Sequence, residues 1–330
     1  MKNILNYLYS HKTLTREEAR MVLTRIAQGE FNHSQIASFL SVYIMRNITL
    51  DELAGFRDAL LELCIPIRLD EFNTIDLCGT GGDGKNTFNI STLSSFVVAG
   101  AGYKVTKHGN YGVSSGCGSS NIMEKLGYKF SAEEAKLKRE IDQAGICYLH
   151  APLFNPAMKN VAPVRKDLGV RTFFNILGPL INPTFPKNQM VGVFNLELVR
   201  IYNYLYQQSD KNYIVLYSLD GYDEISLTGP FKLVSRNWEH IYQPEDLGFQ
   251  RVDPQKLAAG ATVDESVDIF MRVLEGKGTP EQTNVVIANS AVGIHCLEPE
   301  KSLPQCIEIA QDSLLNGKAL GVLKKLLELQ

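Results

Sequence analysis

Residues 78–92 read CGTGGDGKNTFNIST, and four glycines fall within positions 79–84 of this run. From Asp83 to Glu124 the chain then continues for 40 residues without a carboxylate, although it carries 36 acidic residues in all. Glycine lets backbone N–H groups approach a ligand closely, and missing carboxylates remove repulsion against an anion. The stretch therefore predicts a site for phosphate groups.

Two familiar nucleotide-binding loops fit this stretch poorly. Residues 79–84 match G-x-G-x-x-G, but a dinucleotide-binding loop leads into a helix and meets an acidic residue ~20 positions later. Here residues 85–89 are expected to be extended, and the acid-free segment covers that position. No G-K-[ST] closes the loop, as a Walker-type P-loop requires. A tight turn alone accounts for two or three glycines, but not for the threonines, Asn89 and Ser91 beside them.

A diphosphate site explains the stretch best. Residues 74–78 are predicted to form a strand that leads into the loop, and residues 92–102 a helix that follows it. Loop N–H groups and the helix N-terminus would point at the anion, and Ser91 or Thr92 could cap the helix or reach a metal or phosphate. Lys107, at the end of the next strand, adds a positive charge. Asp83 fits such a site only if its carboxylate accepts a hydrogen bond.

Composition restricts the class of protein. A net charge of −3 argues against general affinity for nucleic acid, so the phosphate ligand should be small. Six scattered cysteines without a C-x-x-C pair indicate free thiols in a reducing compartment. The first residues are too few and too polar for a signal peptide, and no apolar run approaches the ~20 residues of a membrane span. We expect a cytoplasmic protein.

The pattern of residues along the sequence predicts two domains. The first 65 residues should be helical, with capping boxes at Thr15-x-x-Glu18 and Thr49-x-x-Glu52 and an amphipathic stretch over residues 36–44. Pro66 breaks this pattern. Beyond it, strands alternate with helices, which predicts an α/β domain with a mostly parallel central sheet flanked by helices. Further strands are expected at 103–107, 146–150, 189–195 and 213–219, with edge strands within 231–243; further helices are expected from 131, at 196–208 and 264–275, and from 304 to the end.

Four blocks of sequence resemble the anthranilate phosphoribosyltransferases, a tryptophan-pathway family of the nucleoside-phosphorylase-like class. They are Gly79–Gly84 with Thr87–Thr92, Lys107–Asn110 with Val113–Ser115, Val161–Arg165 through Arg171–Leu180, and Asp223–Gly229. The blocks occur in the family's order, and the resemblance covers essentially the whole chain. It implies Mg²⁺-dependent transfer of phosphoribose from phosphoribosyl pyrophosphate to the amine of anthranilate, with release of pyrophosphate.

The resemblance also implies residue roles. It assigns the phosphoribosyl donor to Gly79, Gly82, Asp83, Thr87, Asn89, Ile90, Ser91, Thr92, Lys107, Ser115 and Ser119. It implies that anthranilate is bound by Gly79, His108, Asn110, Arg165, Gly178 and Pro179. It also implies that two Mg²⁺ ions bind with the diphosphate, held by Ser91, Asp223 and Glu224. Lys107, His108, Asn110 and Arg165 are the expected catalytic group. The chemistry of these side chains agrees with the assigned roles. The adjacent carboxylates of Asp223 and Glu224 suit Mg²⁺, and the guanidinium of Arg165 suits the anthranilate carboxylate.

The chain departs from the family's pattern at a few positions. The family often has arginine where Tyr111 stands, lysine and serine at Gly116 and Cys117, and histidine at Asn155. These changes bear on affinity and acceptor scope more than on the reaction. A pyrimidine-nucleoside phosphorylase of the same fold and a silent phosphoribose-binding protein are the alternatives.

In the family the helical part forms a homodimer. The resemblance therefore predicts a dimerisation domain at residues 1–70, joined by a returning segment at about 171–183. Residues 71–330 would form the catalytic domain that binds phosphoribosyl pyrophosphate.

Overall fold

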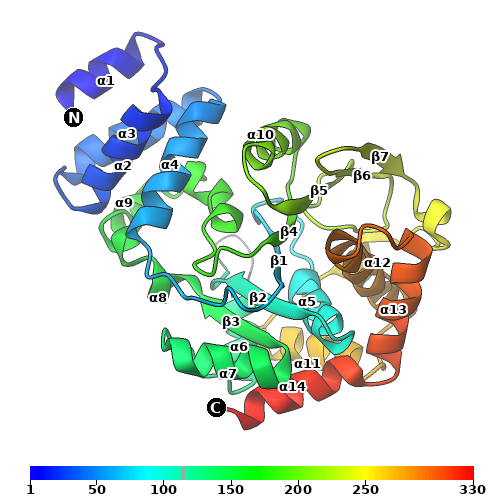
Figure 1. The fold of residues 1–330 in the computed structure, drawn as a ribbon. Coiled ribbons are helices and arrows are strands. Elements are labelled where there is room, and N and C mark those ends of the chain that lie inside the picture. The colour runs from blue at the N-terminus through cyan, green and yellow to red at the C-terminus, as the bar shows by residue number, and fades with distance from the viewer. Residues whose placement is uncertain (113–115) are drawn as a thin grey trace. The chain divides into compact units, whose positions relative to one another are not determined.

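A computed structural model describes residues 1–112 and 116–330, so the expected donor residue Ser115 lies outside the described residues. The chain divides into two compact units, one of residues Met1–Pro66 and Ala151–Pro183 and one of residues Ile67–His150 and Thr184–Gln330. The segment that returns to the helical unit thus begins at Ala151, twenty residues before the start expected from the sequence. Figure 1 labels the α-helices and strands of both units.

The first unit is helical. Its elements are α1 (Lys2–Tyr9), α2 (Arg16–Ala27), α3 (His33–Met45), α4 (Leu50–Leu63), α8 (Ala151–Phe154), η1 (Pro156–Asn160), α9 (Ala162–Leu168), η2 (Phe173–Ile176) and η3 (Gly178–Leu180). Both predicted capping boxes are present, at the N-termini of α2 and α4. In the core, the Phe173 ring of the returning segment stacks on Phe56 at 4.4 Å and meets Phe39 edge-on. Burial of these rings stabilises the unit and explains why the returning segment belongs to it.

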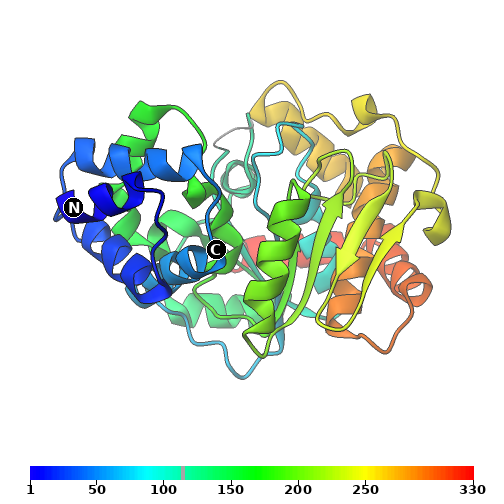
Figure 2. The same ribbon diagram turned by 90° about the horizontal axis from the view of Figure 1, so that it is seen from above.

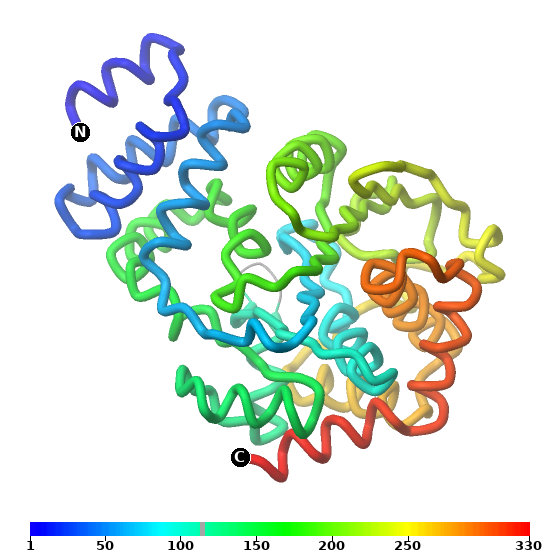
Figure 3. Tube along the Cα trace, viewed as in Figure 1, coloured from blue at the N-terminus to red at the C-terminus, as the bar shows by residue number. Residues whose placement is uncertain are grey.

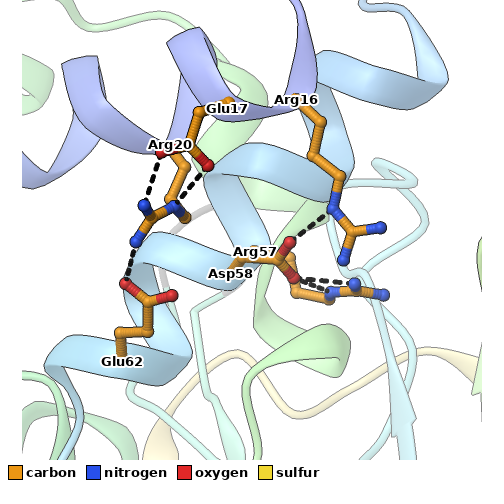
Figure 4. Close-up of polar contacts among 6 residues, drawn as sticks. All are labelled: Arg16, Glu17, Arg20, Arg57, Asp58 and Glu62. Carbon is orange, nitrogen blue, oxygen red and sulfur yellow. Dashed lines mark hydrogen bonds and ion pairs between the residues drawn. The ribbon is translucent and has the colours of Figure 1, made fainter.

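Ion pairs on the surface join α2 to α4 (Figure 4). Arg16 Nε lies 2.6 Å from an oxygen of Asp58, and Arg20 bridges Glu17 on its own helix and Glu62 on α4. Arg57 shares the Asp58 carboxylate. Since several of these side chains are solvent-exposed, each pair contributes little to stability. They fix the contact between two helices whose apolar faces supply most of the stabilisation.

The second unit holds a seven-stranded sheet of order β3-β2-β1-β4-β5-β6-β7. Its strands are β1 (Thr74–Gly79), β2 (Lys104–Gly109), β3 (Ile146–His150), β4 (Asn188–Gly192), β5 (Asn212–Ser218), β6 (Phe231–Val234) and β7 (Glu239–Tyr242). The first five strands are parallel, and β6 and β7 extend the edge as an antiparallel pair. The mostly parallel sheet and its edge strands confirm the predictions.

Helices cover both faces of this sheet. They are α5 (Ile90–Gly100), α6 (Ser119–Lys125), α7 (Glu134–Ala144), α10 (Leu196–Gln207), η4 (Pro244–Leu247), η5 (Pro254–Leu257), α11 (Val263–Leu274), α12 (Pro280–Leu297), α13 (Leu303–Leu315) and α14 (Lys318–Glu328). Figure 2 shows α10 on one face of the central strands and α5 and α12 on the other. Ile75 and Leu77 of β1 point into the core on the side of α5 and α12. The sheet is thus buried on both sides, as parallel sheets are.

Several predicted boundaries were wrong. The first helix after the glycine loop begins at Ile90 with Asn89 as its N-cap, so Ser91 and Thr92 lie inside its first turn and do not cap it. Helix α7 begins at Glu134, because the Ser131 hydroxyl accepts a hydrogen bond from Glu133 N and forms a turn before the helix. The predicted final helix is two helices, α13 and α14, separated at Gly317 with φ +74° (Figure 3).

Candidate active site

The glycine loop lies at the point where the strand order reverses. After β1 the chain builds β2 and β3 on one side, and then returns to place β4 on the other side of β1. Gly79 ends β1, Gly192 ends β4, and the two glycines are register partners. In open α/β sheets, ligands bind beyond the carboxyl ends of the strands at such a switch point. The loop that the sequence singled out therefore lies where sheets of this topology bind their ligands.

The acid pair Asp223-Glu224 lies against this switch point. A Cβ atom added at Gly192 would lie 1.5 Å from the Asp223 carbonyl oxygen, and one added at Gly79 would lie 2.2 Å from Asp223 Oδ2. Both distances are far below any van der Waals contact. The two strands can hold the acid pair this closely only because each ends in glycine.

We expect Gly192→Ala to reduce activity about tenfold to a hundredfold, since overpacking costs about 1–3 kcal/mol and here displaces a candidate ligand. Gly229→Ala is the matched control, because Gly229 follows the same acid pair, has no positive φ and would bring a Cβ only to 3.9 Å from Asp220. Steady-state kinetics and thermal unfolding of both variants check this. Equal activity of the two variants would contradict it.

The acid pair also accepts hydrogen bonds from the glycine loop, from Thr87 and from the first turn of α5. Gly81 N donates to Asp223 Oδ2 at 2.6 Å, and Ser91 N donates to Glu224 Oε1 at 3.1 Å. Thr87 Oγ1 donates to Glu224 Oε2 at 3.2 Å. In this structure the carboxylates therefore occupy two N–H groups that the sequence analysis assigned to phosphate. The loop therefore binds the acid pair directly. The residue pattern alone predicted only that the loop binds phosphate.

The electrostatics of the acid pair are unusual. Burial, and next the negative charge of Asp83, raise the pKa of Asp223 to about 7. Burial and the charges of Asp223 and Asp83 also raise the pKa of Glu224 well above its ordinary value. Hydrogen bonds from Gly81 to Asp223 and from Ser91 and Thr87 to Glu224 lower the two pKa values, but they do not offset burial and the repulsion from neighbouring carboxyl groups. A nearby positive charge would relieve this repulsion.

Two buried hydroxyl groups, one in the loop and one in the first turn of α5, are left without a hydrogen bond within the described residues. The hydroxyls of Thr80 and Thr92 are buried and have no hydrogen-bond partner among the residues that the structure describes. An unpaired buried hydroxyl is costly and marks a place where a ligand or water completes the site. Thr92 lies in the first turn of α5, whose N-terminus attracts anions. The surroundings of the loop thus fit an anionic ligand together with a cation.

Within the described part of the chain, no three Asp, Glu, His or Cys side chains converge closely enough to enclose a metal ion. Asp223 and Glu224 supply oxygen ligands, and Mg²⁺ usually takes one or two carboxylates and completes its shell with water and substrate phosphates. The arrangement fits that mode of binding. It does not fit a closed structural metal site.

The remaining candidates of the α/β unit lie around the carboxyl ends of β1 and β2. Lys107 and His108 are buried; Lys107 Nζ donates to His108 O at 3.2 Å, and His108 N donates to Asp76 Oδ1 at 3.2 Å. Asn110 is exposed, and its carbonyl oxygen accepts from Ser120 N at 3.1 Å. Asp83 Oδ1 accepts a hydrogen bond from Lys85 N, as the sequence analysis required of a carboxylate in a phosphate site. One such bond offsets the repulsion between this carboxylate and a phosphate only in part. Gly82, Asn89 and Ile90 lie in the loop and at the start of α5, and Ser119 begins α6.

The other predicted acceptor residues belong to the helical unit. The Arg165 guanidinium lies over the Phe174 ring at 5.3 Å, and burial lowers its pKa. It makes no ion pair with any residue that the structure describes. Gly178 and Pro179 form η3, and Asn155 is buried with no partner for either side-chain atom among the described residues. This unit therefore carries a half-buried free cation and an unsatisfied amide, both suited to a polar ligand.

Sequence reasoning missed the residues that hold the acid pair in place. Ser218 Oγ, at the end of β5, donates to Glu224 O at 2.6 Å. Asn289 of α12 accepts from Ile225 N at 3.0 Å and donates to Ile225 O at 2.8 Å. The buried Asn289, within the largely apolar residues 285–294 of α12, is the one signal that could have revealed this. These contacts fix the backbone that directly follows the acid pair, at the peptide group between Glu224 and Ile225 and at Ile225 O.

Comparison with known proteins now bears on this arrangement. The family model described as "Glycosyl transferase family, a/b domain" matches residues 71–320, and the one described as "Glycosyl transferase family, helical bundle domain" matches residues 2–64. An anthranilate phosphoribosyltransferase of Flavobacterium psychrophilum is 61% identical over 329 residues, covering 100% of this chain and 99% of the relative. One of Bacteroides fragilis is 54% identical with the same coverage. The chain belongs to the anthranilate phosphoribosyltransferase family.

Solved structures agree with this membership. A crystal structure of the anthranilate phosphoribosyltransferase of Thermus thermophilus matches with a TM-score of 0.92 at 31% identity, covering 98% of each chain. The enzyme of Saccharomyces cerevisiae, solved in complex with phosphoribosyl pyrophosphate and Mg, matches with a TM-score of 0.91 at 24% identity. That second likeness establishes the shared fold. Among the described residues, no helix has the length and apolarity that a membrane span requires.

Proposed function

We propose that this protein transfers phosphoribose from phosphoribosyl pyrophosphate to anthranilate. The bond between the ribose anomeric carbon and the pyrophosphate oxygen breaks, and a bond from that carbon to the anthranilate nitrogen forms. The nitrogen loses a proton, and pyrophosphate leaves. The observation that carries the proposal is the acid pair Asp223-Glu224, which the glycine loop binds at the switch point of a chain 61% identical to an anthranilate phosphoribosyltransferase.

Asp223 and Glu224 would hold Mg²⁺, with the Ser91 hydroxyl as a third oxygen ligand, and we infer two ions with the diphosphate. The raised pKa values support this role, because a cation relieves the repulsion among the acids that burial makes costly. When bound, the metal neutralises charge on the leaving pyrophosphate. The chain's own part is to hold both carboxylates rigid through Gly81, Ser91, Ser218 and Asn289.

The donor would be bound by residues around the glycine loop. Those we assign to it are Gly79, Gly82, Asp83, Thr87, Asn89, Ile90, Ser91, Thr92, Lys107 and Ser119. The unpaired hydroxyl of Thr92 at the start of α5 supports this, since it lies where the helix dipole favours phosphate. Lys107 would add positive charge near the growing negative charge of the leaving group.

The acceptor would be bound by the residues that the resemblance to the family assigns to it. We assign Gly79, His108, Asn110, Arg165, Gly178 and Pro179 to anthranilate. The free guanidinium of Arg165 supports this, because its planar fork matches a carboxylate and it has no competing acid among the described residues. The unsatisfied amide of Asn155 offers a further polar contact that would shape acceptor scope.

No base is required before the attack, because an aromatic amine already has a lone pair. Catalysis then rests on positioning the two substrates and on stabilising the leaving group. We infer a loose, oxocarbenium-like displacement with inversion at the anomeric carbon. Lys107, His108, Asn110 and Arg165 are the side chains that would contact the substrates during this step.

Loss of anthranilate fluorescence tests the reaction. Purified protein with phosphoribosyl pyrophosphate, anthranilate and Mg²⁺ should consume anthranilate and release one pyrophosphate per anthranilate, and EDTA should stop both. Folded protein that leaves anthranilate unchanged would overturn the proposal. Consumption of a pyrimidine nucleoside with inorganic phosphate would instead establish a phosphorylase, and tight binding of the donor without turnover a silent binding protein.

We also propose a cytoplasmic homodimer. None of the six cysteines, all of which lie in the described residues, forms a disulfide, in keeping with a reducing compartment. The helical unit exposes several large apolar side chains, among them Met45 at 87%, Tyr9 and Val170 at 53% and Met21 at 49%. Contiguous apolar side chains of this size mark a protein interface, and we infer that those of the helical unit form one.

Light scattering of wild-type protein should give about twice the 36.8 kDa of one chain. Met45→Glu should shift the mass towards that of a monomer, because it places a charge in the apolar contact. Leu315→Glu is the matched control, since Leu315 is 56% exposed on α13 of the other unit. A monomeric wild-type protein would contradict the dimer.

A further inference from the structure

Four polar side chains form one connected chain of hydrogen bonds between β3 and α6. Ser119 Oγ lies 2.7 Å from Tyr148 Oη, Tyr148 Oη lies 2.9 Å from Ser120 Oγ, and Ser120 Oγ lies 2.8 Å from His150 Nδ1. Tyr148, Ser120 and His150 are buried, and only Ser119 is partly exposed. The chain thus runs from a buried imidazole to the one hydroxyl that a ligand can reach.

Counting protons fixes the direction of this chain. Each hydroxyl has one proton to donate. If Ser119 donates its proton to a ligand, its oxygen must accept from Tyr148. Tyr148 must then accept from Ser120, and Ser120 must accept from an Nδ1–H of His150. A single proton on His150 therefore orients all three hydroxyls, and aligned hydrogen bonds of this kind strengthen one another.

The surroundings hold the His150 ring in place for this role. Phe130 stacks on the ring at 4.3 Å, and Tyr111 meets it edge-on at 4.9 Å. Burial lowers the pKa of His150, and the nearby charge of Glu124 offsets this only in part. Neutral imidazole carries one proton, so the bond at Nδ1 depends on which nitrogen holds it.

The Ser119 hydroxyl also lies beside Asn110, one of the residues assigned to anthranilate. Ser119 Oγ is 3.4 Å from Asn110 O, a long contact that a phosphate oxygen would replace. A Cβ added at Gly109 would lie 2.2 Å from both Ser119 Oγ and Tyr148 Oη, so the strand end is built closely around this pair.

We propose that Tyr148 and His150 are positioning residues that turn the Ser119 hydroxyl proton outward, towards a phosphate oxygen of the phosphoribosyl donor. This inference rests on the proposed function, which supplies the ligand of Ser119. It assigns roles to a tyrosine and a histidine that contact neither substrate. We call the set His150, Ser120, Tyr148 and Ser119 the serine relay.

The first test measures the Kd of phosphoribosyl pyrophosphate with Mg²⁺ by calorimetry. Tyr148→Phe should weaken binding about fivefold, the effect of one hydrogen bond. In a Ser119→Ala background the same change should have no further effect, because the hydroxyl that it orients is gone. Tyr213→Phe is the matched control: this buried tyrosine of β5 donates to Asn203 at 2.6 Å, lies outside the serine relay, and should leave Kd unchanged.

The second test uses His150. Asn can present an N–H near the position of Nδ1, so His150→Asn should keep Kd within about twofold, whereas His150→Phe should lose about fivefold. Thermal unfolding confirms that each variant is folded. The serine relay is overturned if Tyr148→Phe weakens binding equally with and without Ser119, or if His150→Asn and His150→Phe are equal. Wild-type protein that binds the donor but leaves anthranilate unchanged overturns the reaction alone, and failure to bind the donor overturns both.

Discussion

The Asp223→Asn and Glu224→Gln variants are expected to lose about a thousandfold in kcat/KM, while their thermal stability stays equal or rises. Removal of one preorganised group that stabilises developing charge typically costs about 10²–10³ in rate, and here the lost carboxylate also holds the proposed cation. Both side chains keep their size, and the amide oxygens can still accept from Gly81 N and Ser91 N. The loss therefore reports charge rather than folding.

The expected gain in stability follows from the direction of the pKa shifts. Both carboxyl groups have a folded pKa above the ordinary value, so their ionised forms are less stable in the folded chain than in the unfolded chain. This penalty grows as the pH rises through the unfolded pKa and is full above the folded pKa, which for Asp223 is about 7. A neutral amide removes it. The gain should therefore be larger at pH 8 than at pH 5.

Asp220→Asn is the matched control for the acid pair. Asp220 lies three residues before Asp223, is exposed, and accepts a hydrogen bond from Thr228. Its variant should change kcat/KM by less than about twofold, since exposed substitutions rarely exceed ±0.5 kcal/mol. The proposed metal role fails if the acid-pair variants keep wild-type activity, or if their dependence on Mg²⁺ concentration is unchanged. Kinetics at several Mg²⁺ concentrations separate these outcomes.

The sequence predicted elements best where a local signal was strong. Thr15-x-x-Glu18 and Thr49-x-x-Glu52 gave the starts of α2 and α4, and alternation of strands and helices gave the parallel sheet. Helix α12 was missed because it is buried nearly all round and so lacks the periodic polar face that identifies a helix. Its Asn289, which binds the backbone beside the acid pair, was missed with it.

The candidate site was predicted as a set of residues, but its internal contacts were not. Gly81 and Asp223 lie 142 positions apart, and nothing local to either indicates that one donates to the other. The resemblance gave Asp223 a role and placed Gly81 only within a motif, while physical reasoning assigned the loop to phosphate alone. Proximity of this kind depends on the strand order and on two glycines at strand ends, which only the folded chain displays. The serine relay, drawn from α6 and β3, lay beyond sequence reasoning for the same reason.

Glu52→Gln is expected to destabilise the helical unit by about 3–5 kcal/mol, the usual cost of breaking a buried ion pair. Glu52 is 0% exposed. Its carboxylate accepts from Arg46, from the Thr49 backbone N–H at 3.0 Å and from the Leu14 backbone N–H at 3.0 Å. One side chain thus joins the start of α4 to the end of α3 and to the segment before α2. An amide would turn an N–H₂ group towards these donors.

Glu18→Gln is the matched control, because Glu18 holds the same position in the capping box of α2 but is exposed. Glutamine serves in a capping box as well as glutamate, so this variant should change stability by less than about 0.5 kcal/mol. Hydrogen exchange of the α2–α4 amides and thermal unfolding measure both variants. Equal losses in the two would show that the buried position of Glu52 adds nothing.

The pH dependence gives Glu52 a second, independent signature. Burial alone would raise its pKa, but Arg46 and the backbone N–H groups of Thr49 and Leu14 outweigh it, so the folded pKa lies below the ordinary 4.5. A lowered folded pKa stabilises the fold fully above the unfolded pKa, and this contribution is lost as the pH falls through the folded value. The difference in unfolding free energy between wild type and Glu52→Gln should therefore be constant from pH 8 to about pH 5.5 and shrink below about pH 4.5. A difference that stayed constant down to pH 3 would mean that the carboxylate charge is not what joins these helices.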